Sequence, residues 1–282
     1  MKCMEPIQGL SKARRKLWGN PQNVISWAFM KQLREHNETR KVYACNPYIE
    51  VYQFRDNLYG LFNQNCDGAG DVWQWLIVGP EKCLLVDTAF GLGDMKALVD
   101  EISGGKEIIV VNTHDHFDHA FGNCRFGRAY CHESLVPLLE AQNEHMWDYL
   151  WDKKTGETIW LDFDKKDLPK FKPYEIIGVP DGYTWDLGKG YLVELINSNG
   201  HGGPGASMYL DHSNKIFSRA TTSVPIFPAA ETYPIPSKNV PCTNTGNASA
   251  GWSAGSTRST PSSPCISSAT WKAECWRTCW SA

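Results

Sequence analysis

The sequence predicts an α+β protein in which two β-sheets pack together and helices lie outside them. Short runs rich in β-forming residues occur in two groups, one in each half of the first 218 residues. Segments with helical spacing lie between the groups, and a histidine-rich motif directly follows an apolar strand. This order is the one expected of an α+β sandwich: strands, a helix, a polar motif at a strand end, helices and then further strands.

The first group of strands is expected at residues 48–54, 57–63, 72–79 and 82–88, separated by Asp-Asn, Gly-Ala-Gly and Gly-Pro turn signals. A helix is expected at 93–105, where it ends at glycine, followed by a buried strand at 107–112. Upstream, residues 20–37 have the apolar spacing of an amphipathic helix.

The second half continues with a strand at 128–131 and a helix at 132–145. Residues 143–173 are charged and aromatic, which indicates an insertion or a lid over a site. Further strands are expected at 174–179, 183–188, 191–197, 206–211 and 214–218.

Composition excludes several classes of function. The net charge of −3 gives no reason to expect a nucleic-acid partner. No apolar run is long enough for a membrane span, and the first residues lack the apolar segment of a signal peptide. We therefore expect a cytoplasmic protein whose ten cysteines are reduced thiols. The sequence carries no signal for an oligomeric state.

The stretch VVNTHDHFDHAFGN, residues 110–123, carries the clearest chemical signal. His114 and His116 are two apart just past a strand, so both imidazoles can point to the same side. Asp118 and His119 follow where the chain should turn, and they can address a second ion nearby. Mixed imidazole and carboxylate donors suit zinc, with iron or manganese as alternatives.

At these residues the chain resembles the metallo-β-lactamase superfamily, whose motif is HxHxDH. The resemblance covers roughly residues 48–218 and implies that family's αββα sandwich. LLVDTAFG looks like the family's DTG element, so Asp87 would support the metals from below them, although Ala89 replaces the usual glycine. NSNGHGGPGAS looks like the third element. By resemblance, His114, His116 and His201 form one metal site, and Asp118 and His119 belong to a second.

Other histidines and aromatics have less specific interpretations. Surface or capping roles are expected for His36, His132, His145 and His212. Trp147, Tyr149, Trp151 and Trp160 are interpreted as packing within the insertion, with a substrate-pocket wall as the alternative.

Two ligands that the family requires are missing. A bridging Asp in a Gly-Asp is expected after residues 214–218, but Arg219, Ala220 and Thr221 stand there. The family's late His is also absent, because residues 219–282 contain no His, no Asp and no Leu. This segment is rich in Ser, Thr, Ala and Pro, yet its Trp and Cys content is unlike that of a disordered tail.

The genetic code offers an explanation, namely that the segment is translated out of frame from about Arg219. Joining the third base of each codon to the first two of the next allows Gly-Asp across Arg219, Ala220 and Thr221. It allows only His or Tyr across Cys265 and Ile266. Glu is forced at Trp271-Lys272, and Leu at each Cys-Trp pair, where degeneracy leaves no choice. We therefore divide the chain into a helical extension (1–42), a metallo-β-lactamase-like domain (43–218) and an anomalous, poorly ordered tail (219–282).

The expected function is metal-dependent hydrolysis, in which a metal-bound hydroxide attacks a small-molecule thioester, lactone or related ester. Asp118 is the expected catalytic residue, and two zinc ions are expected in the intact family site. The first alternative is an inactive or mononuclear remnant that lacks the bridging Asp and the last His. The second is a diiron oxidoreductase, which His116 disfavours because the family's flavodiiron branch has Glu at that position.

Overall fold

The computed structural model describes residues 12, 14–15, 33, 35–64, 71–159, 161–199 and 205–219. The chain divides into the units Met1–Phe227 and Pro228–Ala282, and every described residue belongs to the first. The expected metal ligand His201, the aromatic residue Trp160 and the anomalous segment after Arg219 lie outside the described residues. So does most of the expected N-terminal helix, of which Leu33, Glu35 and His36 are helical.

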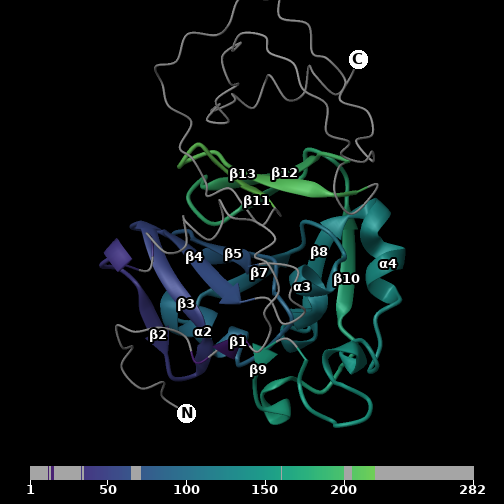
Figure 1. The fold of residues 1–282 in the computed structure, drawn as a ribbon. Helices are drawn as coiled ribbons and strands as arrows, with labels where there is room; N and C mark the ends of the chain where they lie inside the picture. The colour runs from purple at the N-terminus through teal and green to yellow at the C-terminus, as the bar shows by residue number, and fades with distance from the viewer. Residues whose placement is uncertain are drawn as a thin grey trace, which may run out of the picture. The chain divides into compact units, whose positions relative to one another are not determined.

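A larger and a smaller β-sheet form the described structure (Figure 1). The order across the larger sheet is β10 (Glu175–Val179), β8 (Arg128–His132), β7 (Glu107–Val111), β6 (Lys82–Val86), β5 (Asp71–Val78), β4 (Leu58–Gln64), β3 (Asn46–Arg55) and β2 (Lys41–Tyr43). The pairs β6–β7, β7–β8 and β8–β10 are parallel, and the remaining pairs are antiparallel. The smaller sheet is antiparallel, in the order β11 (Thr184–Asp186), β12 (Leu192–Asn197), β13 (Ser207–Asp211) and β14 (Ile216–Arg219). A short third sheet pairs β1 (Arg14–Arg15) with β9 (Leu161–Asp162).

Alternating side chains of the larger sheet supply two separate cores. Leu84 and Val86 of β6 pack with Leu195 and Tyr209 of the smaller sheet, which fills the space between the sheets. Leu85, between them in sequence, points to the opposite face and packs with residues of helix α2 (Met95–Ser103). Because successive strand residues face opposite sides, this apolar run is buried on both faces of the sheet.

Short helices complete the described fold. Helix α2 begins at Asp94, whose side chain accepts the Ala97 N–H at 3.0 Å, and ends at Gly104 with φ of 71°. The others are α3 (Phe117–Ala120), α4 (Val136–Glu140) and the 3-10 helices η1 (Phe121–Arg125), η2 (Glu133–Leu135), η3 (Asp148–Leu150) and η4 (Lys165–Asp167).

The expectation of one helix over residues 132–145 was wrong. The segment forms only η2 and α4 and leaves helical geometry after Glu140. The Asn143 side-chain oxygen accepts the His145 N–H at 3.0 Å, a local turn that competes with helix continuation.

The predicted packing of two sheets with a helix outside is confirmed. Helix α2 covers the larger sheet on the face away from the smaller one. Beyond β14 no helix is described, so a helical layer outside the smaller sheet would have to come from residues outside the described ranges. Among the described residues, no helix is long and apolar enough to cross a membrane.

The buried thiols Cys83 and Cys131 form no disulfide and are fully inaccessible. Burial raises the pKa of Cys83 to about 11 and that of Cys131 to about 12, so at pH 8 both are protonated. We expect neither to react with iodoacetamide in the native protein and both to react in guanidinium chloride, as measured by peptide mass spectrometry. Native labelling at the unfolded rate would contradict the described core.

Candidate metal centre

The adjacent ends of two parallel strands begin the site. Val86 at the end of β6 pairs with Val111 at the end of β7, so Asp87 and Thr113 follow side by side. The Asp87 N–H donates to the Val111 carbonyl at 2.8 Å, which extends the pairing by one step. The polar residues after both strands therefore meet at one edge of the sheet.

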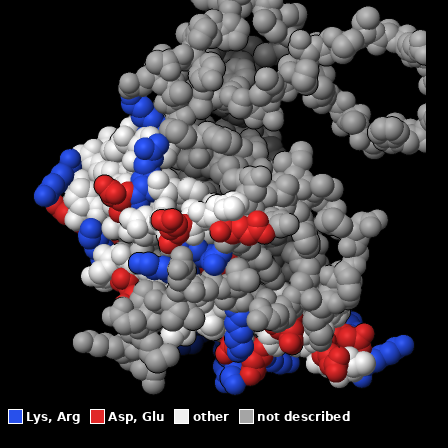
Figure 2. Space-filling model, turned by 60° about the vertical axis from the view of Figure 1, so that its left-hand side comes forward, with Lys and Arg blue, Asp and Glu red and all other residues white. Residues whose placement is uncertain are grey.

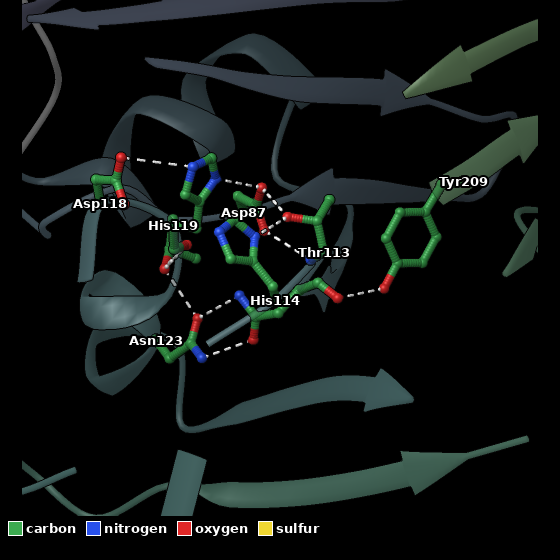
Figure 3. Close-up of polar contacts among 9 residues, drawn as sticks. Asp87, Thr113, His114, Asp118, His119, Asn123 and Tyr209 are labelled. Carbon is green, nitrogen blue, oxygen red and sulfur yellow. Dashed lines mark hydrogen bonds and ion pairs between the residues drawn. The ribbon is translucent and has the colours of Figure 1, made fainter. Parts of the chain in front are cut away.

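Asp87 is 1% exposed, and its carboxylate accepts hydrogen bonds from two segments. Oδ1 accepts the Thr113 N–H at 2.8 Å, and Oδ2 accepts the Thr113 hydroxyl at 2.7 Å. Oδ2 also lies 2.8 Å from Nδ1 of His119 (Figure 3). The carboxylate fixes the His119 ring, so Nε2 is the nitrogen that can bind a metal.

The Thr113 hydroxyl extends this arrangement to His114. The Thr113 hydroxyl donates a hydrogen bond to Asp87 and lies 3.0 Å from Nδ1 of His114, so its oxygen can accept a hydrogen bond from the N–H of that nitrogen. The same tautomer, with Nδ1 protonated, is therefore favoured for His114 and His119. Two of the expected metal ligands, His114 and His119, are therefore oriented through the carboxylate of Asp87.

Two more of the expected metal ligands, His116 and Asp118, lie where the chain enters α3. His116 occupies the N-cap position of this helix, and its carbonyl accepts the His119 N–H at 3.0 Å. The His114 ring lies 4.4 Å from the His116 ring and 4.3 Å from the His119 ring, measured between centroids. An oxygen of Asp118 lies 3.5 Å from Nε2 of His119. The structure thus gathers His114, His116, Asp118 and His119 in one place.

The electrostatics of His119 fit a cationic site. Burial acts to lower its pKa, but the carboxylates of Asp87 and Asp118 outweigh burial and raise the pKa above its ordinary value. These carboxylates favour positive charge at the ring. Among the described residues, no three His, Cys, Asp or Glu side chains already have their donor atoms arranged for an ion. The fifth expected ligand, His201, lies outside the described residues.

Backbone conformation explains the Asp87-Thr88-Ala89 element. Asp87 has φ of 64° and Ala89 has φ of 53°, both in the left-handed region. Glycine adopts that region without strain and alanine does not. Ala89 therefore occupies a conformation that the glycine usual at this position would adopt freely.

Two aromatic residues of the insertion, Trp147 and Trp151, pack within it as expected. Trp147 donates to the Phe90 carbonyl at 2.9 Å and belongs to a buried cluster with Leu150, and the partly buried Trp151 packs against that cluster. Tyr149 is 39% exposed and lies against Phe117, one residue after His116. Of the three described, only Tyr149 combines exposure with a position near the histidines.

The other described histidines have different contacts. His132 caps η2 by accepting the Ser134 N–H, as expected, and His212 lies in a turn and contacts Glu194. His36 and His145 are exposed, and His145 contacts the Asp148 carboxylate.

A separate cavity of about 640 Å³ lies beside α2 and η1. Its lining includes Lys96, Arg125, Lys170 and Lys172 but none of the expected metal ligands.

On the face drawn in Figure 2, acidic and basic side chains are interspersed over the described part.

The described site can now be compared with known proteins. The model of the metallo-beta-lactamase superfamily matches residues 67–208, half of the chain. The chain belongs to this superfamily. Membership supports a metal-dependent hydrolase by family, and the motif of His114, His116, Asp118 and His119 lies within the matched residues.

Solved structures give a more distant similarity. MEM-A1, a subclass B3 metallo-beta-lactamase from a soil metagenome library, is 15% identical with a TM-score of 0.40; the match covers 62% of this chain and 59% of that one. BJP-1, a subclass B3 metallo-beta-lactamase of Bradyrhizobium japonicum, is 22% identical with a TM-score of 0.38, covering 61% and 58%. Rubredoxin oxygen:oxidoreductase from Desulfovibrio gigas is 15% identical with a TM-score of 0.41, covering 59% and 40%. The chain thus spans less than two thirds of each of these proteins. No curated protein sequence matches it significantly.

Thr113 was not identified as a site residue from the sequence, and its hydroxyl can be tested directly. Thr113→Val keeps the side-chain shape but leaves Nδ1 of His114 without its acceptor. An unsatisfied buried polar group costs about 1–3 kcal/mol. We expect a loss of unfolding free energy of that size, measured by urea denaturation, and weaker zinc binding by titration. Thr113→Ser, which keeps the hydroxyl, serves as the control and should retain zinc affinity.

Proposed function

We propose that the chain carries the site of a zinc-dependent hydrolase acting on a small-molecule thioester, lactone or related ester. The single observation that carries this proposal is the shared orientation of His114 and His119 through Asp87. Metal-binding histidines characteristically give their second ring nitrogen to a carboxylate or other acceptor. His114, His116 and His201 would hold one ion, and Asp118 and His119 a second.

The donor chemistry fits a divalent ion. Imidazole nitrogens with a single carboxylate suit zinc, while iron and manganese remain the alternatives. A bound ion would polarise the substrate oxygen and lower the pKa of an attacking water. The Asp118 carboxylate, 7% exposed beside His119, would orient that water and receive its proton. We propose a cytoplasmic protein with a small-molecule substrate and without nucleic-acid or membrane partners.

We further propose that the chain as written is an incomplete form of this enzyme, translated out of frame after about Arg219. The forced Glu and Leu residues in the alternative frame support this reading. The geometry of β14 also supports it. In the antiparallel pair of β13 and β14, Arg219 lies opposite Met208, so the next residue along the chain would lie opposite Ser207. The Ser207 N–H donates to the Thr113 carbonyl at 2.8 Å, next to His114. A ladder extended by one residue would therefore bring position 220, where the alternative frame allows Asp, to the histidine edge.

Substrate hydrolysis tests the proposed activity. The frame-restored chain, loaded with zinc, is assayed on thioesters, lactones, β-lactams and phosphodiesters. We expect turnover of a thioester or lactone, its loss on chelation and its recovery on adding zinc. His116→Ala is the matched variant and should remain inactive with zinc. Turnover that survives both chelation and His116→Ala would contradict a metal-dependent site.

A further inference from the structure

The side chain of Asn123, in η1, is fully buried and makes a hydrogen bond at every position its amide offers. Its oxygen accepts from the Thr88 hydroxyl at 2.8 Å and from Nδ2 of Asn112 at 3.2 Å. Its nitrogen donates to Oδ1 of Asn112 at 2.7 Å and to the Tyr174 hydroxyl at 3.2 Å. A side-chain amide has two donor hydrogens and two acceptor lone pairs, so its capacity is fully used.

The partners of Asn123 belong to the two segments that carry the candidate metal centre. Thr88 directly follows Asp87, and Asn112 directly precedes Thr113 and His114. Figure 3 shows Asn123 beside this group. Asn123 thus contacts the neighbour of the carboxylate that orients His119 and the neighbour of the segment that carries His114.

Two further bonds show how tightly this junction is held. The Thr88 N–H donates to the His119 carbonyl at 2.7 Å, which joins the Asp87 segment to α3. The hydroxyl of Tyr209, from the smaller sheet, donates to the Asn112 carbonyl at 2.7 Å. The backbone on either side of the histidines is therefore fixed to both sheets. Asn123 provides the side-chain connection between the segment that follows Asp87 and the segment that precedes His114.

We propose that Asn123 is a positioning residue for the metal centre, which sets the relative placement of the Asp87 and His114 segments by a reciprocal amide pair with Asn112 and a bond to Thr88. The metal-binding part of this inference rests on the proposed function. The alternative is that Asn123 satisfies buried polar groups without affecting donor placement.

Asn123→Asp is the most informative change because it keeps the size of the side chain. The second oxygen cannot donate to Asn112 or Tyr174, and it would face the Asn112 oxygen directly. Thr88→Val is a milder second variant that removes the bond from the Thr88 hydroxyl to Asn123 and the longer contact of the same hydroxyl with the His119 carbonyl at 3.3 Å. Asn46→Asp is the matched control, since Asn46 is equally buried and bonded to the Leu92 carbonyl, outside the histidine cluster.

The experiment uses the full, frame-restored chain and two readouts. Zinc affinity is measured by competition with a chelator, and exchange of the Thr113 amide hydrogen is followed by NMR without metal. We expect Asn123→Asp to weaken zinc binding by about tenfold, the lower end of the effect of losing a side chain bonded directly to a metal ligand, and Thr88→Val to act in the same direction. Without metal, Thr113 exchange should accelerate by about tenfold or more beyond the global change in Asn123→Asp and not in Asn46→Asp.

The outcomes separate this inference from the proposed function. Equal losses in Asn123→Asp and Asn46→Asp in both readouts would overturn the positioning role, even if the wild-type chain binds zinc. If the frame-restored chain without substitutions binds no zinc, the proposed function fails, and the metal-free exchange of Thr113 still decides the positioning role. If Asn123→Asp does not fold, Thr88→Val decides by the same two readouts.

Discussion

Replacing Asp87 with Asn is expected to weaken zinc binding by about 10–100-fold or more while preserving the fold. Asn tolerates the left-handed backbone that Asp87 adopts at φ of 64°, and its oxygen can still accept the Thr113 N–H. Its amide nitrogen would then face Nδ1 of His119, which would have to become an acceptor. The ring proton would move to Nε2 and remove the lone pair available to a metal.

Asp211→Asn is the matched control for this change. Asp211 is also 1% exposed and accepts from the Tyr191 hydroxyl at 2.6 Å and from Nδ2 of Asn214 at 2.8 Å, but it contacts no expected metal ligand in the described structure. Zinc affinity is measured by chelator competition, and the His119 tautomer by ring nitrogen shifts without metal. Equal zinc affinities in the two variants would show that Asp87 does not set the His119 tautomer.

Restoring the reading frame is expected to change the metal content of the chain from one ion or none to about two, the number in dinuclear hydrolase sites. The literal chain has five of the ligands implied by the resemblance, and Gly-Asp and the late His would supply the others. Metal content is measured by elemental mass spectrometry after zinc loading and desalting. The literal chain with Arg219→Gly and Ala220→Asp isolates the effect of the bridging carboxylate.

The genomic DNA across the codons for residues 214–223 provides the independent check on this prediction. A missing or extra base that reveals Gly-Asp would support the restored frame. An intact frame, or two ions bound tightly by the literal chain, would contradict the proposed translation error.

The strands and the four-donor motif could be predicted from sequence because their signals are local. The apolar runs that form β6 and β7 and the spacing of His114, His116, Asp118 and His119 lie within short windows. Asp87 was found through resemblance, and its predicted place beneath the histidines agrees with its contact to His119. Its role in metal binding remains a prediction.

The hydrogen-bond network could not be predicted because its partners are far apart in sequence. Thr113 and Asp87 meet only after β6 and β7 pair, and Asn123 meets Thr88 only after η1 folds back. The sequence signal was present, since Asn112 and Asn123 flank the motif, but buried asparagines are recognisable only by their partners. The helix expected at 132–145 failed for a local reason, because the Asn143 turn competes with it.

Anomalous diffraction at the zinc edge, from crystals of the zinc-loaded, frame-restored chain, tests the central claim most directly. We predict a peak within about 2.0–2.1 Å of imidazole nitrogens of His114 and His116, the usual zinc–nitrogen distance. The same crystals of Asp87→Asn should show a weaker peak or none. Zinc bound elsewhere, or no zinc at these histidines in the frame-restored chain without substitutions, would contradict the assignment of this cluster as the metal centre.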